Sequence, residues 1–214
     1  YLNGKKWNGN GYNINGNIEF EIKNGNGKGK EYNYDGDLKF EGEYLNGKKH
    51  GQGKEYYQNN KLMFEGEYLN GKIWNGKGYN KEGKIDFEIK EGNGKGKLYN
   101  SIGKLIFEGE YLNGKINGKG KEYSEPFGKL IFEGEYLNGK RNGKGKEYYY
   151  EGLLKFEGKY LNGKKWDGKG YNKEGNIDFE IKEGKGKCKE YNFDDRLIFE
   201  GEYLNGERNG KGKE

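Results

Sequence analysis

The sequence predicts an all-β fold, namely an elongated, single-layer antiparallel meander of tandem β-hairpin repeats. Three observations predict it. Apolar and polar residues alternate with a period of two over short runs, which is typical of half-buried strands. These runs end at Asn-Gly, a pair that favours the tight type I′ turn because both of its central residues need a positive φ. The same unit then recurs along the whole chain, as it does in repeat architectures.

The unit is clearest around Asn138-Gly139, where the chain reads Phe-Glu-Gly-Glu-Tyr-Leu-Asn-Gly-Lys-Arg-Asn-Gly-Lys-Gly. Counting outward from a two-residue turn pairs Glu133 with Lys144 and Phe132 with Gly145. One face then carries aromatic rings opposite glycines, and the other carries opposed charges. A ring over a glycine covers backbone that the missing side chain would leave exposed. Opposite charges across strands add about 0.2–1 kcal/mol per pair.

Hairpins of three lengths keep this pattern. Units with a tryptophan add one residue after the turn, and a three-residue loop there would pair Tyr68 with Trp74 and Phe64 with Gly78. Short units lose the Tyr-Leu step, and counting pairs Phe87 with Gly96. We therefore predict a structural role for the unit-opening phenylalanines and for glycines of the returning strands: Phe20, Phe40, Phe64, Phe87, Phe107, Phe132, Phe156, Phe179 and Phe199, with Gly53, Gly78, Gly120, Gly145, Gly170 and Gly212.

A second set of turns separates the units, at pairs such as Asp35-Gly36 and Glu151-Gly152. Turn residues at both ends of every strand favour a continuous meander over isolated hairpins. Each Trp-containing unit is followed by a short one, which suggests that the insertion and the deletion compensate one another. We expect one continuous array over residues 1–214, of about nine units of 20–25 residues, belonging to a longer chain.

Composition argues against several functional classes. The chain carries 40 basic and 35 acidic residues, interleaved along the sequence, for a net charge of +5. A polybasic surface for nucleic acid or membrane would cluster one sign, so a solvated face of cross-strand ion pairs is favoured. Three tryptophans and many tyrosines could stack bases, but rings at sheet spacing are more typical of packing. Nucleic-acid binding is therefore disfavoured.

Few residues are suited to catalysis or to metal binding. The chain has one histidine, His50, at a position where other units have Asn142 or Asn209, and one cysteine, Cys188, in place of a glycine. One thiol and one imidazole do not make a thiol–imidazole metal site or a nucleophile–base pair. The glutamates recur opposite lysines, which favours structural pairs over acid–base catalysis. We expect no catalytic residue, no metal site, no cofactor and no small-molecule substrate.

The predicted sheet has one aromatic face and no second layer to cover it. Such a face must curl on itself, dimerise or hold a partner. We therefore predict that aromatic residues near the turns contact a partner: Tyr1, Trp7, Tyr44, Tyr68, Trp74, Tyr111, Tyr136, Tyr160, Trp166 and Tyr203.

The unit at residues 132–145 resembles the MORN repeat (membrane occupation and recognition nexus), whose pattern is aromatic-x-Gly-x-aromatic-x-x-Gly-x-x-x-Gly-x-Gly. The resemblance extends over essentially the whole chain. It implies a twisted rod of successive hairpins, often dimeric, that serves as a scaffold at the cytoskeleton and membrane or as an accessory module on lipid kinases and methyltransferases. The short units depart from the pattern, because Ile22, Ile89 and Ile181 replace the first glycine.

The sequence leads to one principal hypothesis, that of a non-catalytic repeat scaffold for protein–protein interaction and self-association. One alternative is a module that binds an anionic phospholipid surface, and another is a structural protein that assembles end to end into filaments. We expect a cytoplasmic location, at the cytoskeleton or a membrane. No apolar run approaches the ~20 residues that a membrane-spanning helix needs.

Overall fold

The computed structural model describes residues 1–214 apart from 1–3, 5–6, 13–14, 126, 193–195 and 214. In the described residues it contains nineteen β-strands and no helix. The paired strands of the described residues are antiparallel and follow one another in the sequence, so the predicted all-β meander of hairpins is confirmed. The chain forms two compact units, one of residues 1–105 with 110–115 and the other of residues 106–109 with 116–214.

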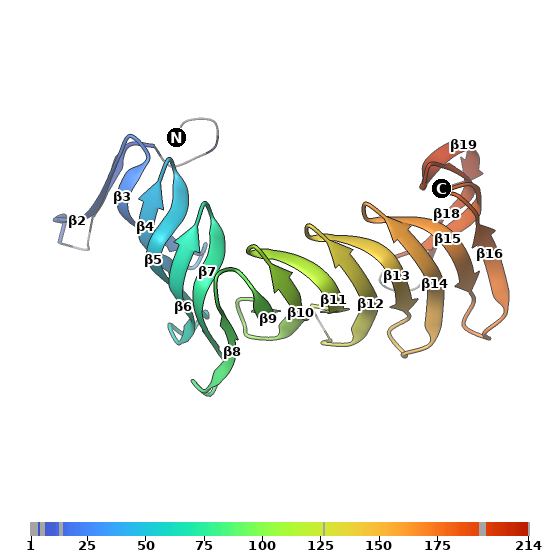
Figure 1. The fold of residues 1–214 in the computed structure, drawn as a ribbon, viewed down its shortest axis with the longest axis horizontal. Coiled ribbons are helices and arrows are strands. Elements are labelled where there is room, and N and C mark those ends of the chain that lie inside the picture. Colours follow the sequence, from blue (N-terminus) through green and yellow to red (C-terminus); the bar gives the residue numbers. More distant parts are fainter. Residues whose placement is uncertain (1–3, 5–6, 13–14, 126, 193–195, 214) are drawn as a thin grey trace. The chain divides into compact units, whose positions relative to one another are not determined.

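The strands lie side by side in chain order within three open sheets (Figure 1). The first sheet comprises β1 (Gly9–Tyr12), β2 (Ile18–Lys23), β3 (Asn26–Tyr32), β4 (Leu38–Leu45), β5 (Lys48–Tyr56), β6 (Leu62–Leu69), β7 (Lys72–Tyr79) and β8 (Ile85–Ile89). The second comprises β9 (Gly94–Tyr99), β10 (Leu105–Leu112), β11 (Lys115–Tyr123), β12 (Leu130–Leu137), β13 (Lys140–Tyr148), β14 (Leu154–Leu161), β15 (Lys164–Tyr171) and β16 (Ile177–Ile181). The third comprises β17 (Gly186–Tyr191), β18 (Leu197–Leu204) and β19 (Glu207–Lys213).

The Asn-Gly pairs form the tight turns that the sequence predicts. Asn138 has a φ of 53° and Gly139 a φ of 86°, so both central residues are left-handed as a type I′ turn requires. The Trp-containing hairpins keep the same two-residue turn, since Leu69 pairs with Lys72 around Asn70-Gly71. The predicted three-residue loop is therefore wrong, because the additional residue forms a bulge inside the returning strand.

The register of the full-length hairpins differs from the prediction by two residues. Phe132 pairs with Glu147 and Glu133 with Lys146, where counting had predicted Gly145 and Lys144. The cause is a bulge of two extra residues in β13, between the pairs Tyr136–Arg141 and Gly134–Gly145. Because the side-chain period of a strand is two, an even number of extra residues leaves the faces unchanged. The aromatic face and the charged face are therefore those that the sequence predicts.

In the Trp-containing hairpins the bulge holds one extra residue, and the predicted outer pairs are confirmed. Phe64 pairs with Gly78, whereas Tyr68 pairs with Ile73 and not with Trp74. The short hairpins differ more. The ring of Phe87 in β8 lies over Gly78 of the preceding strand, whereas β8 and the following strand β9 are joined only by the isolated bridge Lys90–Asn93, so the predicted pairing with Gly96 is not formed.

A column of paired glycines crosses each large sheet. In the second unit Gly120, Gly134, Gly145, Gly158 and Gly168 are successive partners on neighbouring strands. The first unit has the equivalent series Gly29, Gly42, Gly53, Gly66 and Gly76.

The phenylalanine rings lie in the channel that these glycines leave open. A Cβ on Gly145 would lie 2.6 Å from the Cζ of Phe132, so no larger residue fits under the ring. Each of the six predicted structural glycines has such a ring within 2.8 Å of the place of its missing Cβ. The rings fill the channel completely, since Phe40, Phe132 and Phe156 are 0% exposed.

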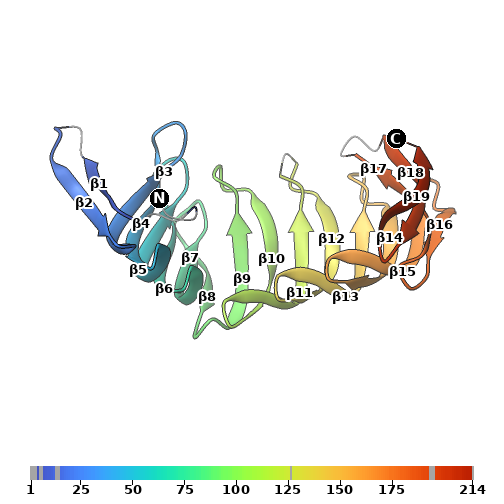
Figure 2. The same ribbon diagram turned by 90° about the horizontal axis from the view of Figure 1, so that it is seen from above.

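The short hairpins interrupt the glycine column. Gly76 pairs with Ile89 and Gly168 with Ile181, and these isoleucine side chains are buried in the channel. Two of the sheets end at these strands, β8 and β16. Figure 2 shows the same succession of bent strands from above.

A ladder of hydrogen bonds connects consecutive Asn-Gly turns within each unit. The N–H of Gly163 donates to the carbonyl oxygen of Arg141 in the preceding hairpin, at 2.8 Å. The N–H of Asn162 donates to Oδ1 of Asn142, at 3.1 Å. The side-chain acceptor at this second position is an asparagine or aspartate in most hairpins: Asn8, Asn26, Asn75, Asn93, Asn117, Asn142 and Asp167.

His50 occupies this acceptor position in one hairpin, which explains why the single histidine stands where other units have asparagine. Its Nδ1 accepts the N–H of Asn70 at 3.4 Å, longer than the asparagine rungs. The imidazole must be neutral at Nδ1 to accept this bond.

Substitution of a column glycine tests the packing of rings on bare backbone. Gly145→Ala is expected to lower the free energy of unfolding by about 1–3 kcal/mol, because the methyl group overlaps a buried ring that has no free space. Urea unfolding at neutral pH measures the change. Gly9→Ala is the control, since its Cβ would meet nothing within 4 Å, and equal effects of the two variants would contradict the packing argument.

The turn ladder predicts that His50→Asn stabilises the protein. An amide oxygen can approach the N–H of Asn70 more closely than the imidazole does, which should raise the free energy of unfolding by about 0.5–1.5 kcal/mol. Asn142→Ala should lower it by a similar amount, and thermal unfolding of both variants measures the effect. Asn209→Ala is the matched control, because no described residue donates to Asn209. If His50→Asn leaves the free energy of unfolding unchanged, and Asn142→Ala and Asn209→Ala lower it equally, the ladder contributes nothing to stability.

Candidate functional site

The aromatic rings cover one face of the sheets, here called the inner face, and pack against one another. Phe132 meets Tyr136 and Tyr160 edge to face, with ring centroids 5.7 and 5.2 Å apart. Phe40 has the same arrangement with Tyr44 and Tyr68. Edge-to-face pairs of this kind contribute about 0.5–1.5 kcal/mol beyond the area they bury. The inner face is therefore a continuous layer of rings within each sheet.

The residues predicted to contact a partner are mostly part of this layer. Tyr44, Tyr68, Tyr136 and Tyr160 are buried, with at most 6% of their surface exposed. Those left half-buried are Trp7, Trp74, Tyr111, Trp166 and Tyr203, and Tyr1 lies outside the described residues. That any of these rings contacts a partner stays a prediction.

A cation lies over the phenylalanine ring in several hairpins. The guanidinium carbon of Arg141 is 3.9 Å from the ring centroid of Phe132. Its NH2 group donates to Glu122 at 2.6 Å and its NH1 group to Glu147 at 3.0 Å. Lys49, Lys165 and Arg208 lie over Phe40, Phe156 and Phe199 in the same way.

The glutamates that bind these cations also accept hydrogen bonds from the next tyrosine of the inner face. Tyr136 donates to Glu122 at 2.6 Å, and Tyr160 donates to Glu147 at 2.9 Å. Each of these glutamates lies in a Lys-Glu-Tyr segment of the strand before the tyrosine. Sequence reasoning missed the role of these glutamates, although Lys-Glu-Tyr recurs about 13 residues before a tyrosine and could have revealed it. The glutamates that bond to the next tyrosine in this way are Glu31, Glu122, Glu147 and Glu190.

These contacts shift the pKa values of the groups involved. Burial opposes ionisation of Glu122, but hydrogen bonds from Arg141 and Tyr136 hold its pKa below the ordinary value of 4.5. The pKa of Glu147 is also lowered, since Lys165 and Arg141 outweigh the effect of burial. Both carboxylates therefore carry their negative charge at neutral pH, and the inner face is an ordered network of paired charges over rings.

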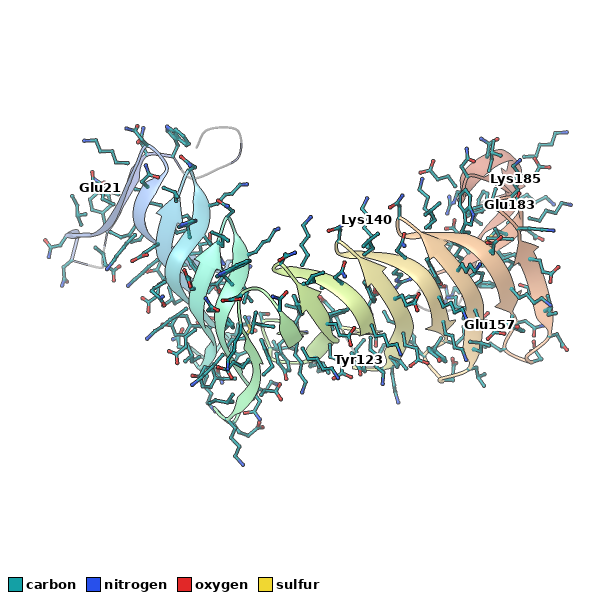
Figure 3. All side chains as sticks on the ribbon, viewed as in Figure 1. Glu21, Tyr123, Lys140, Glu157, Glu183 and Lys185 are labelled. Carbon is teal, nitrogen blue, oxygen red and sulfur yellow. The ribbon has the colours of Figure 1, made fainter. Side chains whose placement is uncertain are left out.

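The opposite face, here called the outer face, has its own tyrosine–carboxylate pairs. Tyr123, labelled in Figure 3, lies near the end of the sheet away from the Asn-Gly turns and donates to Glu108 at 2.7 Å. Tyr148 donates to Glu133 at 2.5 Å. Burial, followed by the hydrogen bond to glutamate, raises the pKa of Tyr148 to about 12. Both faces of the single-layer sheet are thus occupied largely by contacts within the chain.

The tryptophans pack on the short hairpins that follow them. The N–H of Gly184 donates to the carbonyl oxygen of Trp166 at 2.7 Å, and a Cβ on Gly184 would lie 2.8 Å from the indole ring. Trp74 and Gly92 show the same arrangement in the first unit. The tryptophan of the longer hairpin therefore fills the space beside the turn of the shorter one. This agrees with the order in the sequence, where each Trp-containing unit is followed by a short one.

Exposed leucines recur on the outer face beside the Asn-Gly turns. We call this part of the outer face the turn side of the sheets. The leucine directly before the turn faces outward, because the tyrosine before it faces inward. Its cross-strand partner is in most cases the lysine after the turn, as in Leu137–Lys140 and Leu161–Lys164. These leucines are between 39% and 49% exposed: Leu45, Leu112, Leu137, Leu161 and Leu204.

Other groups considered from the sequence have structural surroundings. Cys188 is buried in the glycine column opposite Gly201, and burial raises the pKa of its thiol to about 11. A shallow hollow of about 250 Å³ in the second unit is lined in part by Arg141 and Glu147, which are already paired with each other. Within the described part of the chain no group of three or more His, Cys, Asp or Glu side chains could hold a metal ion. Nor do those residues include a helix long and apolar enough to cross a membrane.

Comparison with known proteins identifies the repeat. The family model of the MORN repeat matches residues 40–61, 107–125, 132–153 and 199–214. These segments begin at the phenylalanines of four full-length hairpins, and the Trp-containing and short hairpins that begin at Phe64, Phe87, Phe156 and Phe179 lie between them. A comparison with curated proteins found no match.

The inner-face network predicts an acid-dependent loss of stability. Because the pKa values of Glu122 and Glu147 are lowered in the folded protein, their contribution is present above pH 4.5 and is lost as the pH falls below it. Arg141→Met should reduce the free energy of unfolding by roughly 1–3 kcal/mol at pH 7 and should weaken its pH dependence between pH 3 and 5. Urea unfolding across this range measures both effects. Lys146→Met removes an exposed ion pair and is the control, and an unchanged pH dependence in Arg141→Met would contradict the assignment.

Proposed function

Because this chain is a MORN-repeat protein, we propose that it is a non-catalytic scaffold that binds other proteins, further copies of itself included. The observation that carries the proposal is the recurrence of an exposed leucine beside the turn in most full-length and Trp-containing hairpins, Leu69 being less exposed than the others. Single exposed leucines are ordinary on protein surfaces. A leucine at the same place in hairpin after hairpin is different, because it offers a partner several apolar contacts at regular spacing.

The spacing follows from the sheet. Leu137 and Leu161 lie at equivalent positions two strands apart, and neighbouring strands are about 4.8 Å apart, so the two side chains are about 10 Å from one another. Lysines beside the leucines give the same surface a polar rim. Apolar contacts surrounded by charged residues are the usual composition of protein interfaces.

The interleaving of charge favours a protein partner over a lipid surface. The second outer-face row from the leucines contains Glu133, Lys146 and Glu157 on three adjacent strands, with Lys146 3.9 Å from Glu157. Near an anionic membrane each lysine contributes about 1 kcal/mol, and neighbouring glutamates offset that attraction. A protein partner can place charges of either sign opposite such a row.

Panning a displayed library of random peptides on the immobilised full chain tests this function. We expect enriched sequences that bind with micromolar affinity and that bind about tenfold more weakly to the double variant Leu137→Asp/Leu161→Asp. Light scattering over a concentration series measures self-association in parallel. The variant Leu98→Asp changes an exposed leucine away from the turns and is the control. A chain that enriches no peptide and keeps one mass at all concentrations would refute the proposal.

A further inference from the structure

One junction between hairpins carries two lysines directly opposite each other. On the outer face Lys144 of β13 pairs with Lys159 of β14. At the equivalent place the other described junctions that lead into a full-length or Trp-containing hairpin hold Lys28–Glu43, Gln52–Glu67, Lys119–Glu135 and Lys187–Glu202. Like charges directly opposite each other, with Cβ atoms about 5 Å apart, destabilise a sheet. Among these described junctions the β13–β14 junction is the exception, because it alone lacks a glutamate on the later strand.

No carboxylate of the described residues forms an ion pair with either lysine. Glu135 is nearby, but its carboxylate accepts the backbone N–H of Lys144 at 2.9 Å. Asp167 lies opposite Lys159 on the next strand, and it accepts the backbone N–H of Glu183 at 2.7 Å. Both lysine side chains are exposed. The positive charge of this junction therefore faces solvent.

Two exposed leucines and a third lysine adjoin the pair. Leu137 is 48% exposed and Leu161 is 41% exposed. Lys140 lies opposite Leu137 beside the turn (Figure 3) and forms no ion pair among the described residues. We call these five residues the basic patch: Leu137, Lys140, Lys144, Lys159 and Leu161.

We propose that the basic patch binds an acidic amphipathic helix of a partner protein, whose carboxylates form the ion pairs that Lys144 and Lys159 do not form with the described residues. The inference rests on the proposed function and specifies the partner's chemistry. The leucines are about 10 Å apart. Apolar residues at positions i and i+7 of a helix are about 10.5 Å apart and lie on one face. Acidic residues at i+3 and i+4 lie between the leucines, one on each side of the line that joins them, so one faces the Lys144–Lys159 pair and the other lies toward the turn, on the side of Lys140.

An extended strand or a flat anionic membrane fits the patch less well. Residues of a strand that share one face are about 6.6 or 13 Å apart, which misses the leucine spacing. A membrane would also cover the neighbouring row, where Glu133 and Glu157 flank Lys146 on the same face. The helix, by contrast, can lie along the turn side, over the lysines and leucines alone.

The probe is a labelled synthetic helical peptide of about 16 residues, long enough to form a helix, with leucines at i and i+7 and glutamates at i+3 and i+4. Fluorescence anisotropy with the full chain measures its affinity. We expect saturable binding that weakens with added salt, since the paired charges are screened. A peptide with lysines in place of the glutamates should bind at least tenfold more weakly. Failure of the acidic peptide to bind would overturn the proposal.

The variant Lys159→Glu separates binding from folding. It restores a Lys–Glu pair with Lys144 but also sets a glutamate opposite Asp167, so its unfolding temperature should stay close to that of the wild type, while its affinity for the acidic peptide should fall about tenfold. Lys187→Glu makes the same charge change at the β17–β18 junction, away from the patch, and should leave the affinity unchanged. Equal effects of the two variants on affinity would overturn the proposal.

Two further outcomes distinguish this inference from the proposed function. If library peptides bind the wild type and Lys159→Glu equally, the scaffold function is supported, but the basic patch takes no part in it. Vesicles containing phosphatidylserine that bind the wild type but not Lys159→Glu, with no binding of the acidic peptide, would assign the surface to a membrane and overturn the helix proposal.

Discussion

The structure depends on the contact between a phenylalanine ring and the bare backbone of paired glycines. Each glycine pair opens a channel across the sheet, and the ring that fills it is excluded from water without a second layer of structure. A single-layer sheet has no opposing sheet or helix to form a core. The glycine column replaces that core, because glycines have no side chains and the rings can therefore lie directly on the backbone of the sheet. Every other feature of the hairpin preserves this contact.

The bulges show how strongly the contact constrains the rest of the hairpin. Full-length hairpins carry two extra residues in the returning strand and Trp-containing hairpins carry one, yet in both the ring still lies over glycine. Trp166 fills the space beside the shortened turn at Gly184, and Ile181 fills the channel where the glycine is missing. An insertion in one hairpin and a deletion in the next are therefore accommodated together.

The sequence was sufficient to predict the strands, the turns and the two faces. The alternation of apolar and polar residues and the Asn-Gly pair are local signals, because each depends only on residues within one hairpin. The register was not predictable from the same signals. A bulge of two extra residues, as between Arg141 and Gly145, leaves the alternation of apolar and polar residues in the sequence unchanged, so the sequence does not reveal it. The inner-face glutamates were missed for a related reason. Glu147 and Tyr160 are 13 residues apart in different hairpins, so their contact follows only from the register.

The aromatic layer also decides where function can reside. A residue such as Tyr160 contacts the hairpins on both sides of it, so a change there disturbs several neighbours at once. The turn side of the outer face is freer, because its leucines are exposed to solvent. A hairpin can acquire a specific surface there without altering the fold, provided that the cost of the change is small. Replacing the usual glutamate with Lys159 is such a change: it gives up about 0.2–1 kcal/mol of cross-strand attraction and leaves two exposed charges for a partner to neutralise. In a repeat protein, a position that departs from the pattern at a small cost in stability is therefore where recognition is best sought.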